Sequence, residues 1–199
     1  FIFDPGQQCS RMSGDELKDG ISGAHILICN DYEFELIRQK TEMGEKEALE
    51  QVDILIVTKG EKGSSVITKK GQVDVPAVEP RKVADPTGVG DAFRGGLLKG
   101  FAMGLSADEA AKIGSVAATY CLEHLGGTYH SYTWGEFENR YKEHFGTLTA
   151  EHRAGPSVTC SRDRRSCRPL SLYRPDLHRR RRRRDRRRDR QSARTPVRR

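Results

Sequence analysis

The residues best suited to chemistry lie between Asp85 and Gly96, where the chain reads DPTGVGDAFRGG. A Gly-Val-Gly turn stands before an apolar, small-residue segment that predicts a helix. Such a turn presents backbone N–H groups to one point, and the helix dipole adds positive potential there. We therefore expect Gly88, Val89 and Gly90 to form an anion hole. Asp91 at its mouth could take a proton from a hydroxyl, and together these parts suit the transfer of phosphate from a nucleotide to an alcohol.

A bare Gly-x-Gly-Asp could also be only a tight turn with a helix cap. The full string is more specific. It resembles the C-terminal signature of the ribokinase-like (PfkB) carbohydrate and nucleoside kinases, Asp-Thr-x-Gly-Ala-Gly-Asp-x-Phe-x-Gly-Gly, from which Pro86 and Val89 depart. The local form is most similar to the bacterial adenosine kinase branch. The resemblance implies an ATP-dependent kinase with Asp91 as its catalytic base.

Asn30 and Glu33 directly follow an apolar run that predicts a buried strand. Their spacing is that of a capping box, in which each side chain accepts the other residue's N–H. The resemblance adds a second role, because the family carries an Asn-x-x-Glu motif here that organises magnesium, water and phosphate. It implies that Asn30 contacts ATP and that Glu33 reaches Mg²⁺ through water, which suits an ion that dehydrates reluctantly. Both roles can hold together, since a capped helix end also attracts anions.

A polar loop from Thr58 to Ser64 joins the next apolar strand to a predicted hairpin. Its residues alone indicate a loop with two glycines at positive φ. The resemblance implies ATP contacts, because the family carries Thr-x-Gly-x-x-Gly at this place and Thr58, Gly60 and Gly63 match it. The chain has no Gly-x-x-x-x-Gly-Lys-Ser/Thr sequence, which excludes a P-loop enzyme.

Two interpretations are open for Asp85 with Thr87, and two for Arg94. Asp85 either caps the turn or, with Thr87, helps to bind a monovalent cation such as K⁺, as the resemblance implies. A cation there would change the electric field of the anion hole. Arg94 lies one helical turn beyond Asp91, and it either contacts the transferred phosphate or forms an exposed salt bridge.

Short apolar runs alternate with helical stretches along residues 1–147, which predicts a parallel sheet wrapped by helices. Strands are expected at Phe1–Asp4, His25–Cys29 and Asp53–Thr58, followed by a hairpin of Ser64–Thr68 and Gln72–Val75. Helices are expected at Ser13–Gly20, Tyr32–Thr41, Lys46–Gln51, Asp91–Met103, Ser106–Leu125 and Trp134–Phe145. Ser106 and Glu109 have capping-box spacing. With the resemblance, the fold class is α/β, a three-layer ribokinase-like fold with a mostly parallel central sheet flanked by helices.

The charge changes abruptly near residue 150. Residues 1–150 hold 16 Lys and Arg against 23 Asp and Glu, whereas residues 151–199 hold 19 Arg, no Lys and 5 acids. We expect 148–199 to be a disordered Arg-rich tail, because it has too few apolar residues to form a core. The sudden loss of Lys favours a shifted reading frame in a GC-rich gene. A basic arm that binds nucleic acid through phosphates and a solvated linker are the alternatives.

The chain opens on the apolar run FIF rather than on Met. No secretion signal is visible, and no apolar run reaches the length of a membrane helix. We therefore expect a fragment of a cytoplasmic protein without a membrane partner. The five cysteines show no Cys-x-x-Cys spacing, which argues against zinc. Cys29 and Cys121 lie in apolar elements and are expected to be reduced core residues.

Together these features predict an ATP-dependent phosphotransferase that acts on a primary hydroxyl of a nucleoside, adenosine first. A sugar kinase of the ribose or fructose type is the alternative, as is an inactive nucleotide-binding remnant with a basic tail that binds nucleic acid. In the family that the chain resembles, the amino-terminal half supplies most substrate contacts and a lid. We therefore expect residues 1–147, the nucleotide-binding and catalytic part, to have little activity alone.

Overall fold

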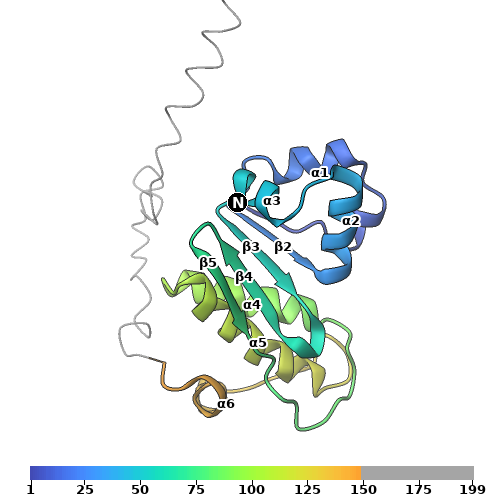
Figure 1. Ribbon diagram of the computed structural model, residues 1–199. Helices are drawn as coiled ribbons and strands as arrows, with labels where there is room; N and C mark the ends of the chain where they lie inside the picture. The colour runs from blue at the N-terminus through green and yellow to red at the C-terminus, as the bar shows by residue number, and fades with distance from the viewer. Residues whose placement is uncertain (149–199) are drawn as a thin grey trace, which may run out of the picture. The chain divides into compact units, whose positions relative to one another are not determined.

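A computed structural model describes residues 1–148, and a five-stranded sheet forms their middle layer (Figure 1). The strands are β1 (Ile2–Phe3), β2 (Ile26–Asn30), β3 (Ile54–Thr58), β4 (Ser64–Thr68) and β5 (Gly71–Val75). They lie in chain order, with β1, β2 and β3 parallel and with β4 and β5 added antiparallel. The parallel part has helical crossovers, as parallel pairing requires, and the predicted hairpin forms the antiparallel edge.

Helices cover both faces of the sheet and complete a three-layer α/β fold (Figure 1). One face is covered by α1 (Gly14–Ile21), α2 (Asp31–Thr41) and α3 (Glu45–Gln51), and the other by α4 (Val89–Ala102) and α5 (Ala107–Leu122). Strands β2 and β3 serve both layers because successive side chains point to opposite faces. Leu27 and Leu55 belong to the first core, whereas Ile28 and Ile56 belong to the second.

The predicted elements all form, with ends that differ by at most three residues. The largest difference is at α5, which ends at Leu122 rather than at Leu125. The Leu122 carbonyl accepts the N–H groups of Ala84 and Asp85, at 2.9 and 3.2 Å, so these bonds to another segment take the place of a further helical turn. Two short 3₁₀ helices were not predicted, η1 (Gly6–Ser10) and η2 (Gly60–Lys62). The last helix, α6 (Trp134–Phe145), has the predicted bounds.

Helices α4 and α5 approach each other at glycines. A Cβ at Gly96 would lie 2.8 Å from the Cα of Gly114 and 2.8 Å from the carbonyl oxygen of Ile113. Both contacts are shorter than a Cβ tolerates, so the two helices can pack at this distance only because Gly96 has no side chain. The adjacent Gly95 is exposed, and a Cβ there would meet no atom within 4 Å.

Alanine at these two neighbouring positions should therefore have opposite effects on stability. We expect Gly96→Ala to lower the free energy of unfolding by about 1–3 kcal/mol, because it overpacks the contact between α4 and α5. Gly95→Ala should raise it by about 0.5–1 kcal/mol, because alanine is the better helix former and nothing obstructs it. Urea unfolding of the two variants gives the comparison. Equal effects at both positions would contradict the role assigned to the glycine contact.

The chain beyond α6 bears on two predictions. Residues 149–199 lie outside the described residues, and so does the predicted Arg-rich tail except for its first residue. That residue, Leu148, is 6% exposed and packs in the cluster between α5 and α6.

Within the described part, no helix is both long and apolar enough to span a bilayer. Cys29 and Cys121 are buried and unpaired, which confirms their assignment to the core.

Candidate active site

The predicted anion hole lies at the start of α4, in a turn that Asp85 holds on two sides. Asp85 Oδ1 accepts the Thr87 N–H at 2.8 Å, and Oδ2 accepts the Gly126 N–H at 2.9 Å. The hydroxyl and the N–H of Thr87, followed by the N–H of Gly126, stabilise the charged carboxylate and hold the pKa of Asp85 below its ordinary value. Asp85 therefore caps the turn, as one of its two interpretations predicted, and it ties the turn to the loop after α5.

Gly88 gives this turn its shape. Its φ of 79° lies in the left-handed region, and a Cβ at this position would lie 2.7 Å from the Cα of Gly127. The next three residues begin α4, so their N–H groups have no acceptor within the helix. The Val89 N–H donates to the Pro86 carbonyl at 3.3 Å. This leaves the N–H groups of the second and third helix residues for an anion.

Asp91 and Arg94 are neighbours on the first turn of α4. The Asp91 side chain is 91% exposed, and its Oδ1 lies 3.9 Å from Nη1 of Arg94. Arg94 pairs with Asp4, the residue after β1: Nη2 donates to Asp4 Oδ1 at 3.1 Å, and Nε lies against Oδ2. The two side chains are 27% and 28% exposed, so this is a half-buried pair between distant segments. The salt bridge that one interpretation of Arg94 predicted therefore forms, with Asp4 as its partner.

Asn30 and Glu33 form the predicted capping box at the start of α2. Asn30 Oδ1 accepts the Glu33 N–H at 2.7 Å, and Glu33 Oε2 accepts the Asn30 N–H at 2.9 Å. The cap uses one oxygen of the Glu33 carboxylate and does not need the other. Such a donor set fits one water-mediated contact to Mg²⁺ rather than a complete cage. Among residues 1–148, no three His, Cys, Asp or Glu side chains group as metal ligands.

The loop between β3 and β4 begins beside Asn30. Asn30 and Thr58 are register partners at the ends of β2 and β3. Gly60 and Gly63 have the predicted positive φ, at 57° and 83°. The Gly63 carbonyl accepts the Lys59 N–H at 2.7 Å, which closes the loop.

These groups gather at one edge of the sheet, because the carboxyl ends of parallel strands meet there. Asp4 follows β1, while Asn30 and Thr58 end β2 and β3. The Asp4–Arg94 pair brings the start of α4 to the same edge. The buried thiol of Cys29 lies among them: burial raises its pKa, the charge of Glu33 adds to the rise, and that of Arg94 opposes it.

A family model described as pfkB family carbohydrate kinase matches residues 3–134, which is more than half of the chain. The chain belongs to the PfkB carbohydrate kinase family. It is 35% identical over 142 residues to a nucleoside kinase of Methanocaldococcus jannaschii, covering 71% of this chain and 47% of the relative. It is also 38% identical over 80 residues to an inositol 3-kinase of Arabidopsis thaliana, covering 40% of this chain and 22% of that one.

Solved structures of a nucleoside kinase from Burkholderia thailandensis show the same fold as this PfkB chain. The complex with inosine aligns with a TM-score of 0.73 at 38% identity, covering 75% of this chain and 49% of that one. The complex with ADP-inosine gives a TM-score of 0.71 at the same identity, covering 73% and 46%. The fold is therefore ribokinase-like, and the chain spans about half the length of the nucleoside kinases that it matches.

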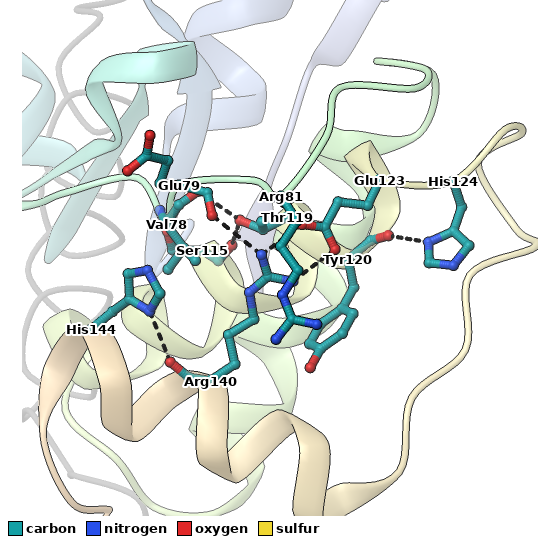
Figure 2. Close-up of polar contacts among 10 residues, drawn as sticks. All are labelled: Val78, Glu79, Arg81, Ser115, Thr119, Tyr120, Glu123, His124, Arg140 and His144. Carbon is teal, nitrogen blue, oxygen red and sulfur yellow. Dashed lines mark hydrogen bonds and ion pairs between the residues drawn. The ribbon is translucent and has the colours of Figure 1, made fainter.

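In this PfkB chain, the segment that leads from β5 to the turn lies along α5 (Figure 2). Ser115 Oγ donates to the Pro76 carbonyl and accepts the Val78 N–H, both at 3.1 Å. One turn further along, Thr119 Oγ1 donates to the Val78 carbonyl at 3.1 Å. Helix α5 thus fixes the course of the chain before it reaches the predicted anion hole.

A buried ion pair between Glu123 and Arg140 also holds the segment between β5 and the turn (Figure 2). Nη1 and Nη2 of Arg140 donate to the two oxygens of Glu123 at 2.7 and 2.6 Å, and Glu123 Oε1 also accepts the Arg81 N–H at 2.6 Å. Arg140 Nη2 reaches the Glu79 carbonyl at 3.2 Å, and the guanidinium lies over the ring of Tyr120. Burial raises the pKa of Glu123, but its bonds to Arg140 and Arg81 outweigh burial and lower it overall.

Sequence reasoning missed Asp4, Cys121, Glu123 and Arg140 as parts of the site and its support. Asp4 had a usable signal, because an acid directly after a parallel strand lies at the edge where ligands bind. The Cys121 Sγ lies 3.5 and 3.6 Å from the carbonyl oxygens of Thr87 and Gly127, so its single S–H can donate to either. Nothing in the local sequence signals Cys121 or the ion pair, since each contact depends on how α5 packs.

Proposed function

We propose that this chain carries the nucleotide-binding part and the general base of a kinase that transfers the γ-phosphoryl group of ATP to a primary hydroxyl of a nucleoside, adenosine first. One observation carries the proposal: the exposed carboxylate of Asp91 directly follows the Gly88 turn at the start of α4. A base beside an anion-binding helix end is what this transfer requires. Similarity to nucleoside kinases, one of them solved with inosine and with ADP-inosine, supports the substrate class.

In the proposed reaction, Asp91 takes the hydroxyl proton as the hydroxyl oxygen bonds to the γ-phosphorus and the bond to ADP breaks. The N–H groups of Gly88, Gly90 and Asp91 stabilise the charge on the transferred group. The Val89 N–H joins them when its long bond to Pro86 opens. Arg94 adds its guanidinium, since Nη1 already lies 3.9 Å from Asp91. Arg94 is therefore proposed as a phosphate contact.

The nucleotide is proposed to lie along the ends of β2 and β3. Asn30, Thr58, Gly60 and Gly63 contact ATP there, the last three through the loop before β4. Glu33 would hold Mg²⁺ through water, and the ion would supply positive charge beside the nucleotide.

Asp85 and Thr87 are proposed as ligands of a monovalent cation, K⁺, beside the turn. The lowered pKa of Asp85 favours its charged form, which suits this role. We further propose that residues 1–147 form the catalytic part, that 148–199 form a separate tail, and that the reaction takes place in the cytoplasm, where ATP is abundant.

A sugar or cyclitol kinase of the same family is the second candidate. The similarity of 80 residues to an inositol 3-kinase favours it. The proposed mechanism would be unchanged, because the base and the anion hole act on the hydroxyl whatever ring carries it.

The test is ADP release from ATP and Mg²⁺ with adenosine, inosine, ribose, fructose and myo-inositol. Because the chain spans about half the length of its nucleoside kinase relatives, we expect slow turnover from the 199-residue chain. We expect fast turnover from a fusion in which the amino-terminal half of the M. jannaschii enzyme precedes Phe1. Turnover of the unfused chain at a complete relative's rate would show that the amino-terminal half is not required. Turnover with a sugar alone would make that sugar the substrate in place of adenosine. ATP binding without turnover in the fusion would reduce the proposed function to nucleotide binding.

A further inference from the structure

Asp4 holds Arg94 in a defined position, although 90 residues separate them. Asp4 is itself fixed, because its Oδ1 also accepts the Gly6 N–H at 3.1 Å, so that the carboxylate closes the turn after β1. It presents both oxygens to Arg94, one to Nη2 and one to Nε. A guanidinium bound along one edge in this way loses its freedom to rotate.

The remaining edge of the guanidinium faces the predicted anion hole. Nη1, the nitrogen that Asp4 does not bind, lies 3.9 Å from Asp91 Oδ1. It also lies close over Gly90, since a Cβ at Gly90 would be 2.7 Å from it. Asp4 thus takes two nitrogens of Arg94 and leaves the third between the proposed base and the proposed phosphate site.

Without Asp4, Arg94 has another partner on its own helix. An Asp and an Arg three residues apart on a helix form an ion pair readily, and a guanidinium binds a carboxylate best with two nitrogens. Arg94 would then close onto Asp91, which is the exposed carboxylate of the two. Such a pair would withdraw the guanidinium from the phosphate and occupy the base.

We propose that Asp4 is a positioning residue: it holds Arg94 by Nε and Nη2 so that Nη1 stays directed to the γ-phosphate of ATP and Asp91 stays open to the substrate hydroxyl. The inference rests on the proposed function, because it takes the turn at Gly88 as the site of the transferred phosphate. Position and charge predict opposite effects of removing Asp4. Loss of a negative charge alone would tighten the binding of ATP, whereas loss of the position of Arg94 would weaken it.

The test is the dissociation constant of ATP and of ADP, each with Mg²⁺, measured by calorimetry on the 199-residue chain. Arg94→Gln should weaken ATP binding by about tenfold or more and leave ADP within about twofold, because one charge-assisted contact to the γ-phosphate is lost. Asp4→Asn should cause the same selective loss for ATP. The double variant should match Arg94→Gln alone, since Asp4 acts only through Arg94.

Asp53→Asn is the matched control. It removes another aspartate that pairs with a distant residue, His25, but Asp53 precedes β3 at the opposite edge of the sheet. It should leave the constants for both nucleotides unchanged. If Asp4→Asn does not fold, Arg94→Lys takes its place, because lysine keeps the charge but cannot span both Asp4 oxygens. It should also weaken ATP binding and leave ADP binding unchanged.

Tighter ATP binding in Asp4→Asn, or losses that add in the double variant, would overturn the inference and leave the proposed function intact. Equal losses for ATP and ADP would reduce Asp4 to a structural role and overturn the inference as well. A wild-type chain that folds but binds neither nucleotide would overturn both.

Discussion

Replacing Asp91 by Asn is expected to lower phosphoryl transfer by about 10²–10⁴-fold, the usual contribution of a general base. The amide has nearly the shape of the carboxylate but accepts no proton. The turn at Gly88 should keep its form, because the structure holds it through Asp85 and the close approach of Gly127 rather than through Asp91. ATP binding should therefore persist in this variant.

The measurement is kcat of the fusion with adenosine, together with the dissociation constant of ATP. Asp108→Asn is a suitable control, because Asp108 pairs with Lys112 on α5 and takes no part in the proposed site. It should leave kcat unchanged. Turnover retained in Asp91→Asn would remove Asp91 as the base, whereas loss of ATP binding would point to damage in the turn.

Replacing Arg140 by Ala is expected to lower the free energy of unfolding by about 3–5 kcal/mol, the typical cost of leaving one charge of a buried ion pair without its partner. Glu123 and Arg140 are 6% and 3% exposed, so water replaces little of what is lost. The Glu79 carbonyl would lose its donor as well. The segment that leads into the turn would be held less firmly, although its bonds to Ser115 and Thr119 remain.

Urea unfolding measures this cost, and Arg38→Ala is the matched control. Arg38 also binds a glutamate through two nitrogens, Nε and Nη2, but it and Glu35 are 59% and 44% exposed. Its loss should cost far less stability than the loss of Arg140, because water screens exposed helical pairs. A cost for Arg140→Ala as small as that for Arg38→Ala would show that the buried pair does not stabilise the fold. Replacing both Glu123 and Arg140 by Met should recover most of the stability, since no unpaired charge then stays buried.

The features that were predictable from the sequence are those encoded within a few residues. The capping box of Asn30 and Glu33 needs only their spacing, and Ser106 and Glu109 confirm the same rule at α5, where Glu109 accepts the Ser106 N–H at 3.1 Å. The strands were predicted correctly because continuous apolar runs indicate burial on both faces. The hairpin follows from its turn residues.

The features that were not predictable depend on segments meeting in space. Asp4 and Arg94 are 90 residues apart, and neither carries a sign of the other. Arg140 looks like a surface residue of an amphipathic helix until α6 packs on α5 and brings it to Glu123. The early end of α5 has the same origin, since the Leu122 carbonyl binds a segment that lies far earlier in the chain. The roles of Asp91 and the loop residues in catalysis stay predictions.

The chain order of the sheet has a consequence for folding during synthesis. All five strands are made by residue 75, and each pairs with the one made before it, so the sheet can form while translation continues. The face around Ile28, Ile56 and Val66 has no cover until α4 and α5 follow, the last of them ending at Leu122. At ordinary translation speeds that interval lasts about 2–10 s. During it the nascent chain displays an apolar surface of the kind that chaperones bind and that aggregates when they do not.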